Sequence, residues 1–294
     1  MDTASFILLP DGRHLAFSTT GDPSSTPVVF LHGAPGSRLL GDLNALAQRC
    51  QAYIIAPDRP GYGKSDPTHA SSVLAYITDL IALVDALSLH TFHVAGISAG
   101  CASALAACFA IPNRVRSATL IAGIVPTDTS PCTTRHSSLE LTIASACLAV
   151  PITRALVDRR LRSFIARPEA FINTLAPGLS TWDRQWLSDR ADPIVKARFL
   201  THTLEGFRQG SAGLRGDLPQ LCKGWGFAPE AVSTSVTIWH GTADRIVPPR
   251  NAEALARKLP ACKLQLLDGV GHFVLLDETL LEAVLHDTVR TQPD

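Results

Sequence analysis

Short apolar runs alternate with segments of helical periodicity through the first 126 residues of the chain. Pro27–His32 and Ala52–Pro57 are continuous apolar runs, as expected for strands buried on both faces of a sheet. Ser71–Ser88 places apolar residues at helical spacing, and Ala99–Ala110 is an alanine-rich helical pattern. This alternation predicts an α/β fold in which helices cover both faces of a mostly parallel sheet. Further strands are predicted at Ser5–Leu9, Arg13–Thr20, Thr91–Gly96 and Val115–Ala122, and a further helix at Arg38–Cys50.

The pattern changes between Thr127 and Val232, where helical periodicity continues without a convincing strand and is broken repeatedly by proline. A helical block that interrupts a parallel α/β pattern is typical of an insertion. We therefore predict a core built from residues 1–126 and 233–294, with a helical lid at residues 127–232. In the second core part the pattern predicts strands at Ser235–His240 and Lys263–Leu267, a helix near Asn251–Lys258 and a last helix from about Phe273.

One short segment, GISAG from Gly96 to Gly100, carries the strongest chemical signal. It fits the pattern G-x-S-x-G and lies where a predicted strand ends and a predicted helix begins. Small neighbours allow a strained turn that lifts the Ser98 hydroxyl out of the sheet, and the helix N-terminus behind it stabilises negative charge. In this context Ser98 is the candidate nucleophile, although a serine that merely caps a helix is the alternative.

A serine hydroxyl needs a base to accept its proton. Of the ten histidines, His272 stands in the glycine-rich loop GVGHF between a predicted strand and the last helix, which brings an imidazole to the same edge of the sheet. Asp244, in the segment HGTADRIVPP, follows another predicted strand and is the candidate that orients His272. The chain order Ser, Asp, His is that of one hydrolase architecture. Asp128, after the strand ending near Ala122, is the rival acid.

An oxyanion hole requires two N–H donors. The N–H of Ala99, directly after the nucleophile, is the first candidate. The second is the N–H of Ala34, in the segment HGAPGS that follows a predicted strand, because the flanking glycines allow the backbone to approach a substrate oxygen closely. Pro35 has no N–H and is excluded as a donor.

Composition narrows the function classes further. Apolar residues make up 46% and charged residues 18%, which suits a packed globular enzyme. The 26 basic residues balance 26 acidic ones, so the charge gives no support to a nucleic-acid partner. The seven cysteines include no CxxC pair and favour a reducing compartment over disulfides or zinc. Without a signal-peptide or membrane-helix pattern, we expect a cytoplasmic protein that needs no cofactor or metal.

The segments HGAPGS, DRPGYGKSD, GISAG, HGTADRIVPP and GVGHF occur in the order and context of the α/β-hydrolase superfamily. Together they resemble the lidded bacterial serine hydrolases related to proline iminopeptidases and small esterases. The resemblance covers residues 5–126 and 234–290 and implies the α/β-hydrolase fold and a triad of Ser98, His272 and Asp244. Haloalkane dehalogenases and epoxide hydrolases carry Asp at the position of Ser98. Proline iminopeptidases usually show HGGPG and a Trp after the nucleophile, so HGAPG and Ala99 argue against peptidase activity.

The predicted lid contains two groups of residues that bear on the substrate. Its aromatic residues either pack a core or line an apolar pocket, the core being the commoner role. Its arginines between Arg135 and Arg167 are opposed only by Glu140 and Asp158. They indicate either a carboxylate-bearing substrate or, more often, a solvated helix face.

The sequence thus predicts a hydrolase that cleaves a carboxylic ester or related acyl bond of a small, largely apolar molecule through an acyl-enzyme on Ser98. Three alternatives remain at this stage. The same triad serves carbon–carbon bond hydrolysis of a β-diketone-like substrate and acyl transfer to an alcohol. A ligand-binding protein that keeps the fold without turnover belongs to a different class. The oligomeric state is left open.

Overall fold

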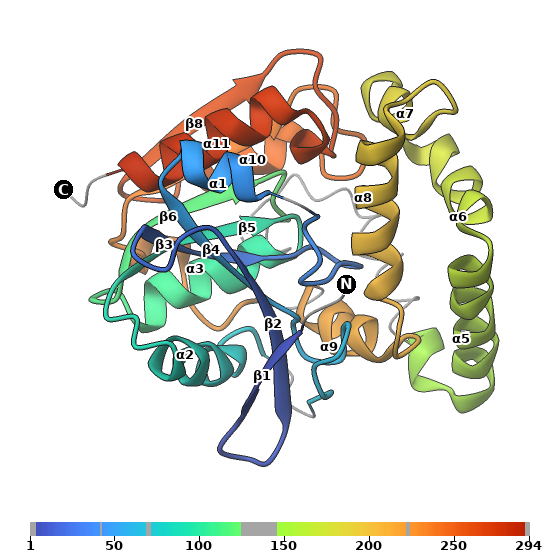
Figure 1. The fold of residues 1–294 in the computed structure, drawn as a ribbon, viewed down its shortest axis with the longest axis horizontal. Helices are drawn as coiled ribbons and strands as arrows, with labels where there is room; N and C mark the ends of the chain where they lie inside the picture. The colour runs from blue at the N-terminus through green and yellow to red at the C-terminus, as the bar shows by residue number, and fades with distance from the viewer. Residues whose placement is uncertain (1–3, 42, 69–71, 125–145, 222–223, 292–294) are drawn as a thin grey trace.

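The computed structural model describes residues 4–41, 43–68, 72–124, 146–221 and 224–291 (Figure 1). Eight strands form one sheet in the order β1-β2-β4-β3-β5-β6-β7-β8. β1 and β2 pair antiparallel, β2 pairs antiparallel with β4, and the remaining pairs are parallel. The prediction of a mostly parallel sheet is confirmed. The strands are β1 Ser5–Leu8, β2 His14–Thr20, β3 Thr26–Leu31, β4 Ala52–Pro57, β5 Phe92–Ile97, β6 Val115–Ile121, β7 Val236–Gly241 and β8 Cys262–Leu267.

Helices cover both faces of this sheet. Leu80, Leu105 and Leu255, from three helices, pack in one buried cluster against one face. Leu46 and Leu285 belong to a second cluster on the opposite face. The helices of the first face are α2 Tyr76–Ala86, α3 Gly100–Ala110 and α10 Pro249–Ala256, and those of the second are α1 Asn44–Arg49 and α11 Glu278–Arg290. The fully buried strands β4 and β7 lie between these two layers, as their continuous apolar sequences predict.

The helix predicted at Arg38–Cys50 is wrong in its first half, because α1 begins only at Asn44. The Arg38 side chain is fully buried and forms an ion pair with Asp58, which holds the backbone in a loop. Gly41 then adopts a φ of 81°, and a Cβ at that position would come within 2.7 Å of the Arg198 side chain. A tertiary ion pair has therefore overridden the helical pattern of the segment. The last helix also starts later than predicted, since α11 follows the 3₁₀ turn η3, Val274–Leu276.

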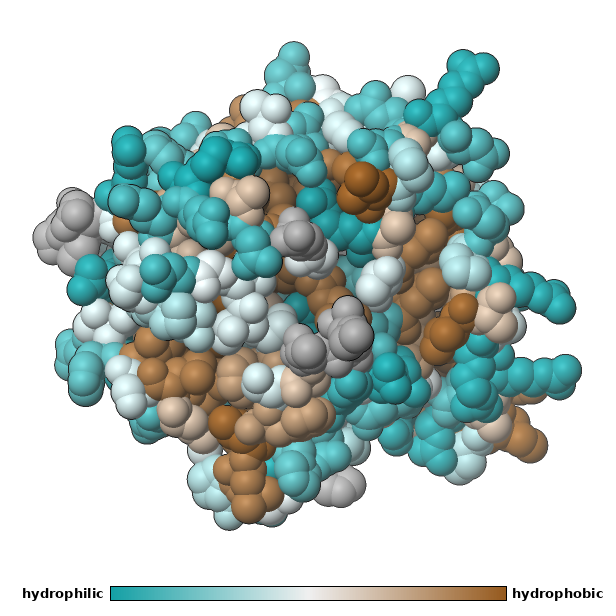
Figure 2. All heavy atoms as spheres, in the orientation of Figure 1, coloured by the Kyte–Doolittle hydropathy of each residue, from teal (hydrophilic) through white to brown (hydrophobic). Residues whose placement is uncertain are grey.

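A block of helices lies between β6 and β7: α5 Pro151–Ala166, α6 Pro168–Leu175, α7 Thr181–Leu187, α8 Pro193–Glu205 and α9 Ala212–Leu221. It has its own apolar cluster, in which Phe164, Phe171 and Phe207 pack together. Figure 2 shows apolar side chains between α8 and the α5–α6 pair, on a surface that is mostly hydrophilic around them. The aromatic residues thus form the core that the block needs in order to fold. Asp128 lies outside the described residues.

None of the described helices combines the length and the apolar composition that a bilayer-crossing helix requires. The cysteines within the described ranges are free thiols, and Cys50, Cys101 and Cys108 are buried.

Candidate active site

Ser98 follows the last residue of β5 and precedes α3, at a sharp turn of the backbone. Its φ of 52° lies in the left-handed region, a strain of about 1–3 kcal/mol for a residue with a Cβ. A Cβ on Gly96 would lie 2.7 Å from the Gly100 carbonyl oxygen, and one on Gly100 would lie 2.1 Å from that of Leu31. The Ser98 N–H donates to Ile121 O over 2.9 Å and fixes the turn to β6. The glycines of GISAG are therefore required by close backbone contacts, and they leave the serine at the sheet edge.

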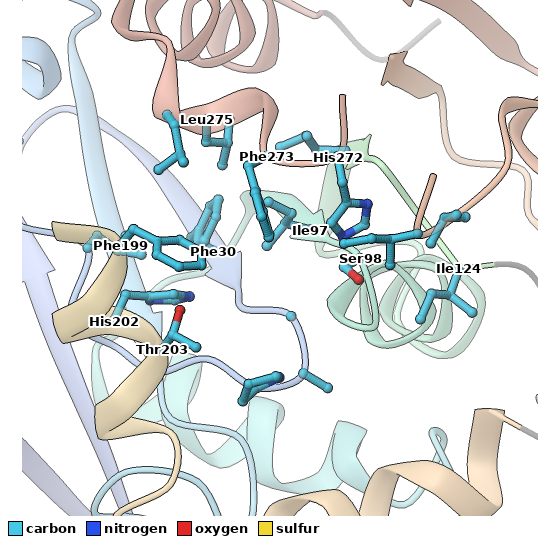
Figure 3. A pocket seen from close by; sticks show the side chains of 18 of the residues that line it. Phe30, Ile97, Ser98, Ile124, Phe199, His202, Thr203, His272, Phe273 and Leu275 are labelled. Atoms are coloured by element: carbon cyan, nitrogen blue, oxygen red, sulfur yellow. The ribbon is translucent and has the colours of Figure 1, made fainter. Parts of the chain in front are cut away.

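His272 and Asp244 are in direct contact. The Nδ1 atom of His272 lies 2.7 Å from Oδ2 of Asp244. Because an ionised carboxylate only accepts hydrogen bonds, Nδ1 carries the proton and Nε2 presents a lone pair. His272 and Ser98 both line one cavity, and Figure 3 shows them on the same part of its wall. No hydrogen bond joins Ser98 Oγ to a described residue, so its hydroxyl is available to a ligand and to the imidazole.

The Asp244 carboxylate is held ionised by its surroundings. Burial alone would raise the pKa of Asp244, but His272, His240 and the backbone N–H of Val247 together hold it below its ordinary range. The second carboxylate oxygen accepts from the N–H groups of Ile246 and Val247, at 2.8 and 2.9 Å. These bonds fix both the charge and the orientation of the group that contacts His272.

The two predicted oxyanion donors both lie beside Ser98. A Cβ on Gly33 would lie 3.2 Å from the Ser98 Cβ and 3.8 Å from its Oγ, so the loop after β3 passes directly beside the serine. The backbone N–H groups of Ala34 and Ala99 have no acceptor among the described residues. Two unpaired N–H groups beside a serine hydroxyl can stabilise an oxyanion.

The loop that carries Ala34 is held from behind by Arg59, a contact that the sequence did not predict. Arg59 donates to the carbonyl oxygens of His32 and Gly33 at 3.0 and 2.9 Å, and it forms an ion pair with Asp217 of α9 at 2.7 Å. The Arg59 N–H donates to Nε2 of His32, whose Nδ1 bonds to Gly33 O. His32 is therefore neutral and structural, and burial holds its pKa well below the usual value.

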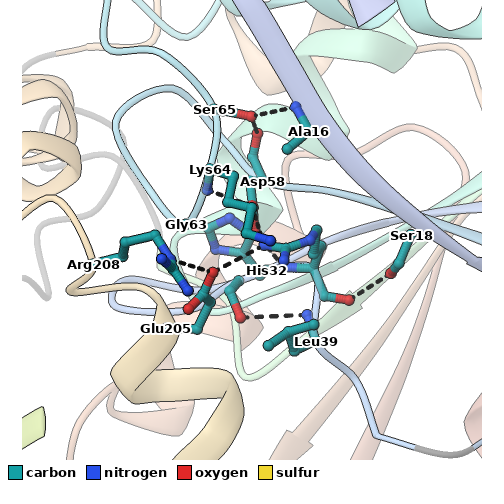
Figure 4. Close-up of polar contacts among 12 residues, drawn as sticks. Ala16, Ser18, His32, Leu39, Asp58, Gly63, Lys64, Ser65, Glu205 and Arg208 are labelled. Carbon is teal, nitrogen blue, oxygen red and sulfur yellow. Dashed lines mark hydrogen bonds and ion pairs between the residues drawn. The ribbon is translucent and has the colours of Figure 1, made fainter. Parts of the chain in front are cut away.

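A second buried network fixes the segment DRPGYGKSD. Asp58 accepts from Arg38 Nη1 at 2.7 Å and from the N–H of Lys64 at 2.9 Å. Glu205 of α8 lies 3.1 Å from Arg38 and 2.8 Å from Arg208 (Figure 4). The network thereby connects the loop after β3, the loop after β4 and the helical block.

Asp183 connects the helical block to the loop of His272, and sequence reasoning missed it. This fully buried carboxylate accepts from the N–H of Phe273 at 2.9 Å and from Ser180 Oγ at 2.7 Å. A Cβ on Gly271 would collide with it. Ser180 and Asp183 form a capping box that the sequence carries as S-x-x-D at the start of α7, but that local pattern does not reveal the distant partner.

Replacing Asp183 with alanine is expected to lower kcat/KM at least about tenfold, because the backbone next to His272 loses its acceptor. It should also lower stability by about 2–3 kcal/mol, since a helix cap and a buried hydrogen bond are lost together. Asp183→Asn keeps an acceptor oxygen and is expected to recover most of the activity. Initial rates and urea unfolding of each variant measure the two effects.

Asp192→Ala is the matched control for this prediction. Asp192 caps α8 through the N–H of Ile194 at 2.7 Å and is exposed. The control should lose about 1 kcal/mol of stability and keep its kcat/KM. Equal kinetic losses in Asp183→Ala and Asp192→Ala would mean that Asp183 acts only as a cap.

A largely apolar cavity of about 800 Å³ opens beside Ser98 and His272. Its size falls within the range of small-molecule sites, about 300–1,000 Å³. Phe164, Phe171 and Phe199 of the helical block line it as well as packing the block's core. These three aromatic residues of the helical block therefore serve both of the roles considered from the sequence.

The arginines of α5 lie away from this cavity. Arg159, Arg160 and Arg162 are exposed, and no described arginine between 154 and 167 lines the cavity. This placement fits the interpretation of these arginines as part of a solvated helix face. Arg198 of α8 is the arginine that lines the cavity within the described ranges.

His202 of α8 is a half-buried residue of the cavity wall, and its titration is expected to make the stability of the protein depend on pH. Burial lowers the pKa of His202 to about 4 from a usual value of 6.5. The folded protein therefore favours the neutral form of His202. The contribution of this residue to the free energy of unfolding is complete above pH 6.5 and is lost as the pH falls toward 4. The loss amounts to about 3 kcal/mol. Urea unfolding at pH 7 and pH 4.5 measures this effect. Between these two pH values the free energy of unfolding should fall less in His202→Gln than in the wild type, and an equal fall in both proteins would contradict the prediction.

Comparisons with known proteins agree with this fold. A family model described as "Alpha/beta hydrolase family" matches residues 28–284. An uncharacterized hydrolase of Bacillus subtilis, YcgS, is 26% identical over 92% of this chain and 93% of its own. The 2-hydroxy-6-oxo-2,4-heptadienoate hydrolase of Pseudomonas putida is 23% identical over 87% and 85%. The structure of a thermophilic esterase from Thermogutta terrifontis superposes with a TM-score of 0.67 at 20% identity, over 98% of both chains.

Proposed function

Since the chain belongs to the alpha/beta hydrolase family, we propose that it is a serine hydrolase that cleaves a carboxylic ester, or a related acyl bond, of a largely apolar small molecule. The observation that carries the proposal is that Ser98, His272 and Ala34 line one largely apolar cavity, with the unpaired N–H of Ala99 directly after the serine. His272 is oriented by Asp244, as a general base requires. The predicted assignment of these residues as triad and oxyanion hole is part of the proposal.

The reaction proceeds in two displacements. Ser98 Oγ attacks the ester carbonyl carbon while Nε2 of His272 accepts the hydroxyl proton, and the carbonyl oxygen becomes an oxyanion beside the N–H groups of Ala34 and Ala99. Collapse of this intermediate breaks the carbon–oxygen bond, and His272 returns the proton to the leaving alcohol. Water then attacks the acyl-enzyme, with His272 as base, and releases the acid and Ser98. Asp244 stabilises the imidazolium in both steps.

We also propose that the helices α5–α9 act as the lid over this cavity. The support is their placement: Phe199 and Thr203 of α8 face the cavity in Figure 3, opposite the edge of the sheet that carries Ser98. The block is fastened to the core through Arg59 with Asp217 and through Asp183 with Phe273. These contacts lie close to both halves of the proposed site.

Carbon–carbon bond hydrolysis is the second candidate, and Arg198 is the observation that favours it. Its side chain is nearly buried and reaches the cavity, donates to Leu275 O at 3.4 Å and lies 3.7 Å from the exposed carboxylate of Glu278. A buried guanidinium of this kind can bind a carboxylate. The Pseudomonas putida relative is named for a substrate that bears one, whereas a neutral ester has no use for such a group.

Initial rates with p-nitrophenyl acetate, butyrate and octanoate test the ester proposal. Release of p-nitrophenol well above the uncatalysed rate is expected with at least one of them. A ring-cleavage diketone carboxylate, assayed in parallel, tests the second candidate. Added alcohols that divert the acyl group into a new ester would reveal acyl transfer. Turnover of the diketone without any ester turnover would overturn the ester proposal and favour the second candidate.

A further inference from the structure

The cavity at Ser98 extends under the helices of one face of the sheet. Six of its lining residues lie in this extension, which we call the arm: Val28, Ile54 and Ala95 from strands β3, β4 and β5, and Leu43, Leu285 and Thr288 from the helical layer above them. Except for Thr288, all belong to the apolar cluster between the sheet and the helices α1 and α11. The arm is thus part of a layer that close packing would otherwise fill.

The periodicity of both walls shows that the arm runs along the sheet away from Ser98. In β3, Val28 and Phe30 point to the same face, and both line the cavity. Leu281, Leu285 and Thr288 form one stripe of α11. At about 1.5 Å per residue, this stripe extends about 10 Å. Figure 3 shows Ile97 close to Ser98 and Phe30 farther from it, toward Phe199.

The chemistry of the arm selects an apolar ligand without a polar end group. Its only polar side chain is Thr288, whose hydroxyl is already paired at 2.8 Å with both Thr119 Oγ1 and Val284 O. Val28 and Thr288 are each 1% exposed, so the far end is closed to solvent. A polar or charged group there would lose its water without gaining a partner.

We infer that the arm holds an unbranched alkyl chain of the substrate, up to about octanoyl length, so that the substrate class is a medium-chain ester. Because a helix packs closely on a sheet, the space between them suits a linear chain better than a ring. The wider chamber beneath α8, where Arg198 and His202 lie, takes the rest of the molecule. The inference rests on the proposed function for the bond that reacts, but the chain-binding arm itself can be tested without turnover.

Calorimetric binding of straight-chain alkanols, from butanol to decanol, tests the arm directly. Affinity is expected to rise about three- to fourfold per methylene until the arm is full, near octanol. Ala95→Leu fills the arm and should end this rise two or three carbons earlier. Leu43→Phe fills it from the helical side and should act in the same direction, so that one poorly folded variant leaves the test intact. Thr203→Leu, which adds bulk to the chamber, is the control and should leave the chain-length limit unchanged.

Kinetics then identify which side of the ester carries the chain. A series of p-nitrophenyl alkanoates varies the acyl chain, and a series of alkyl acetates varies the alcohol. Ala95→Leu should lower kcat/KM for the octyl-length member at least about tenfold relative to the butyl-length member in one of the series. The arm is refuted if folded Ala95→Leu and Leu43→Phe bind alkanols like the wild type, or if Thr203→Leu alone shortens the limit. Alkanol binding with no ester turnover would instead refute the proposed function and leave the arm standing.

Discussion

Ser98→Ala is expected to lower kcat for an activated ester by about 10⁴-fold or more. Without the hydroxyl no acyl-enzyme forms, and the oxyanion donors alone retain only a small residual rate. Alanine fits the turn as serine does, because the crowding there concerns Gly96 and Gly100 rather than the side chain of residue 98. The variant should therefore remain folded, and steady-state assays of p-nitrophenyl butyrate measure the effect.

Ser103→Ala is the matched control for this result. Ser103 lies one turn further along α3 and is buried, but it does not line the cavity. Its replacement should leave kcat within about twofold of the wild type, because it removes a buried hydroxyl from the helix that follows Ser98 without touching the site. If both variants lost activity equally, the loss would reflect the packing of α3 and not the chemistry of Ser98.

Asp244→Asn is expected to lower kcat by about 10³–10⁴-fold with little change in KM. An amide in place of Oδ2 no longer stabilises the imidazolium and can hold His272 in the wrong tautomer. Because the pKa of Asp244 lies below its ordinary range, the wild-type carboxylate stays ionised at every pH of the assay, and the loss should persist from pH 6 to 9. A pH–rate profile of both proteins measures this.

The control for Asp244 is Asp268→Asn, and the rival is Asp128. Asp268 is a nearby exposed carboxylate that accepts from Thr242 Oγ1 at 3.3 Å, and its replacement should leave the rate unchanged. Near-wild-type activity in Asp244→Asn, together with a large loss in Asp128→Asn, would transfer the role of the acid to Asp128.

Several strands were predictable because they are locally apolar runs. β4 occupies the predicted residues Ala52–Pro57, and β5 and β6 are each within one residue of the prediction. The helix predicted from Arg38 failed because the Arg38 guanidinium pairs with Asp58, twenty residues away, and a local pattern does not record such a contact. Buried ion pairs of this kind override local preference, and only the tertiary structure shows them.

The candidate site likewise contains residues that could be predicted from the sequence and residues that could not. Ser98, His272 and Asp244 stand in short segments whose glycines and strand ends are visible in the sequence, so their meeting at one sheet edge could be predicted. Asp183 and Arg59 could not, since their partners lie 90 and 158 residues away. The arm of the cavity could not be predicted either, because apolar residues show the same sequence pattern whether they pack against each other or line a space.

Mass spectrometry after treatment with a fluorophosphonate tests the central claim most directly. Such reagents phosphonylate a serine only when a base activates it, so the reaction requires no knowledge of the substrate. The expected result is a single adduct on the peptide that contains Ser98, formed much more slowly in Asp244→Asn and absent from Ser98→Ala. A folded wild-type protein that remained unlabelled, or that carried the adduct on another serine, would contradict the assignment of Ser98 as the activated nucleophile.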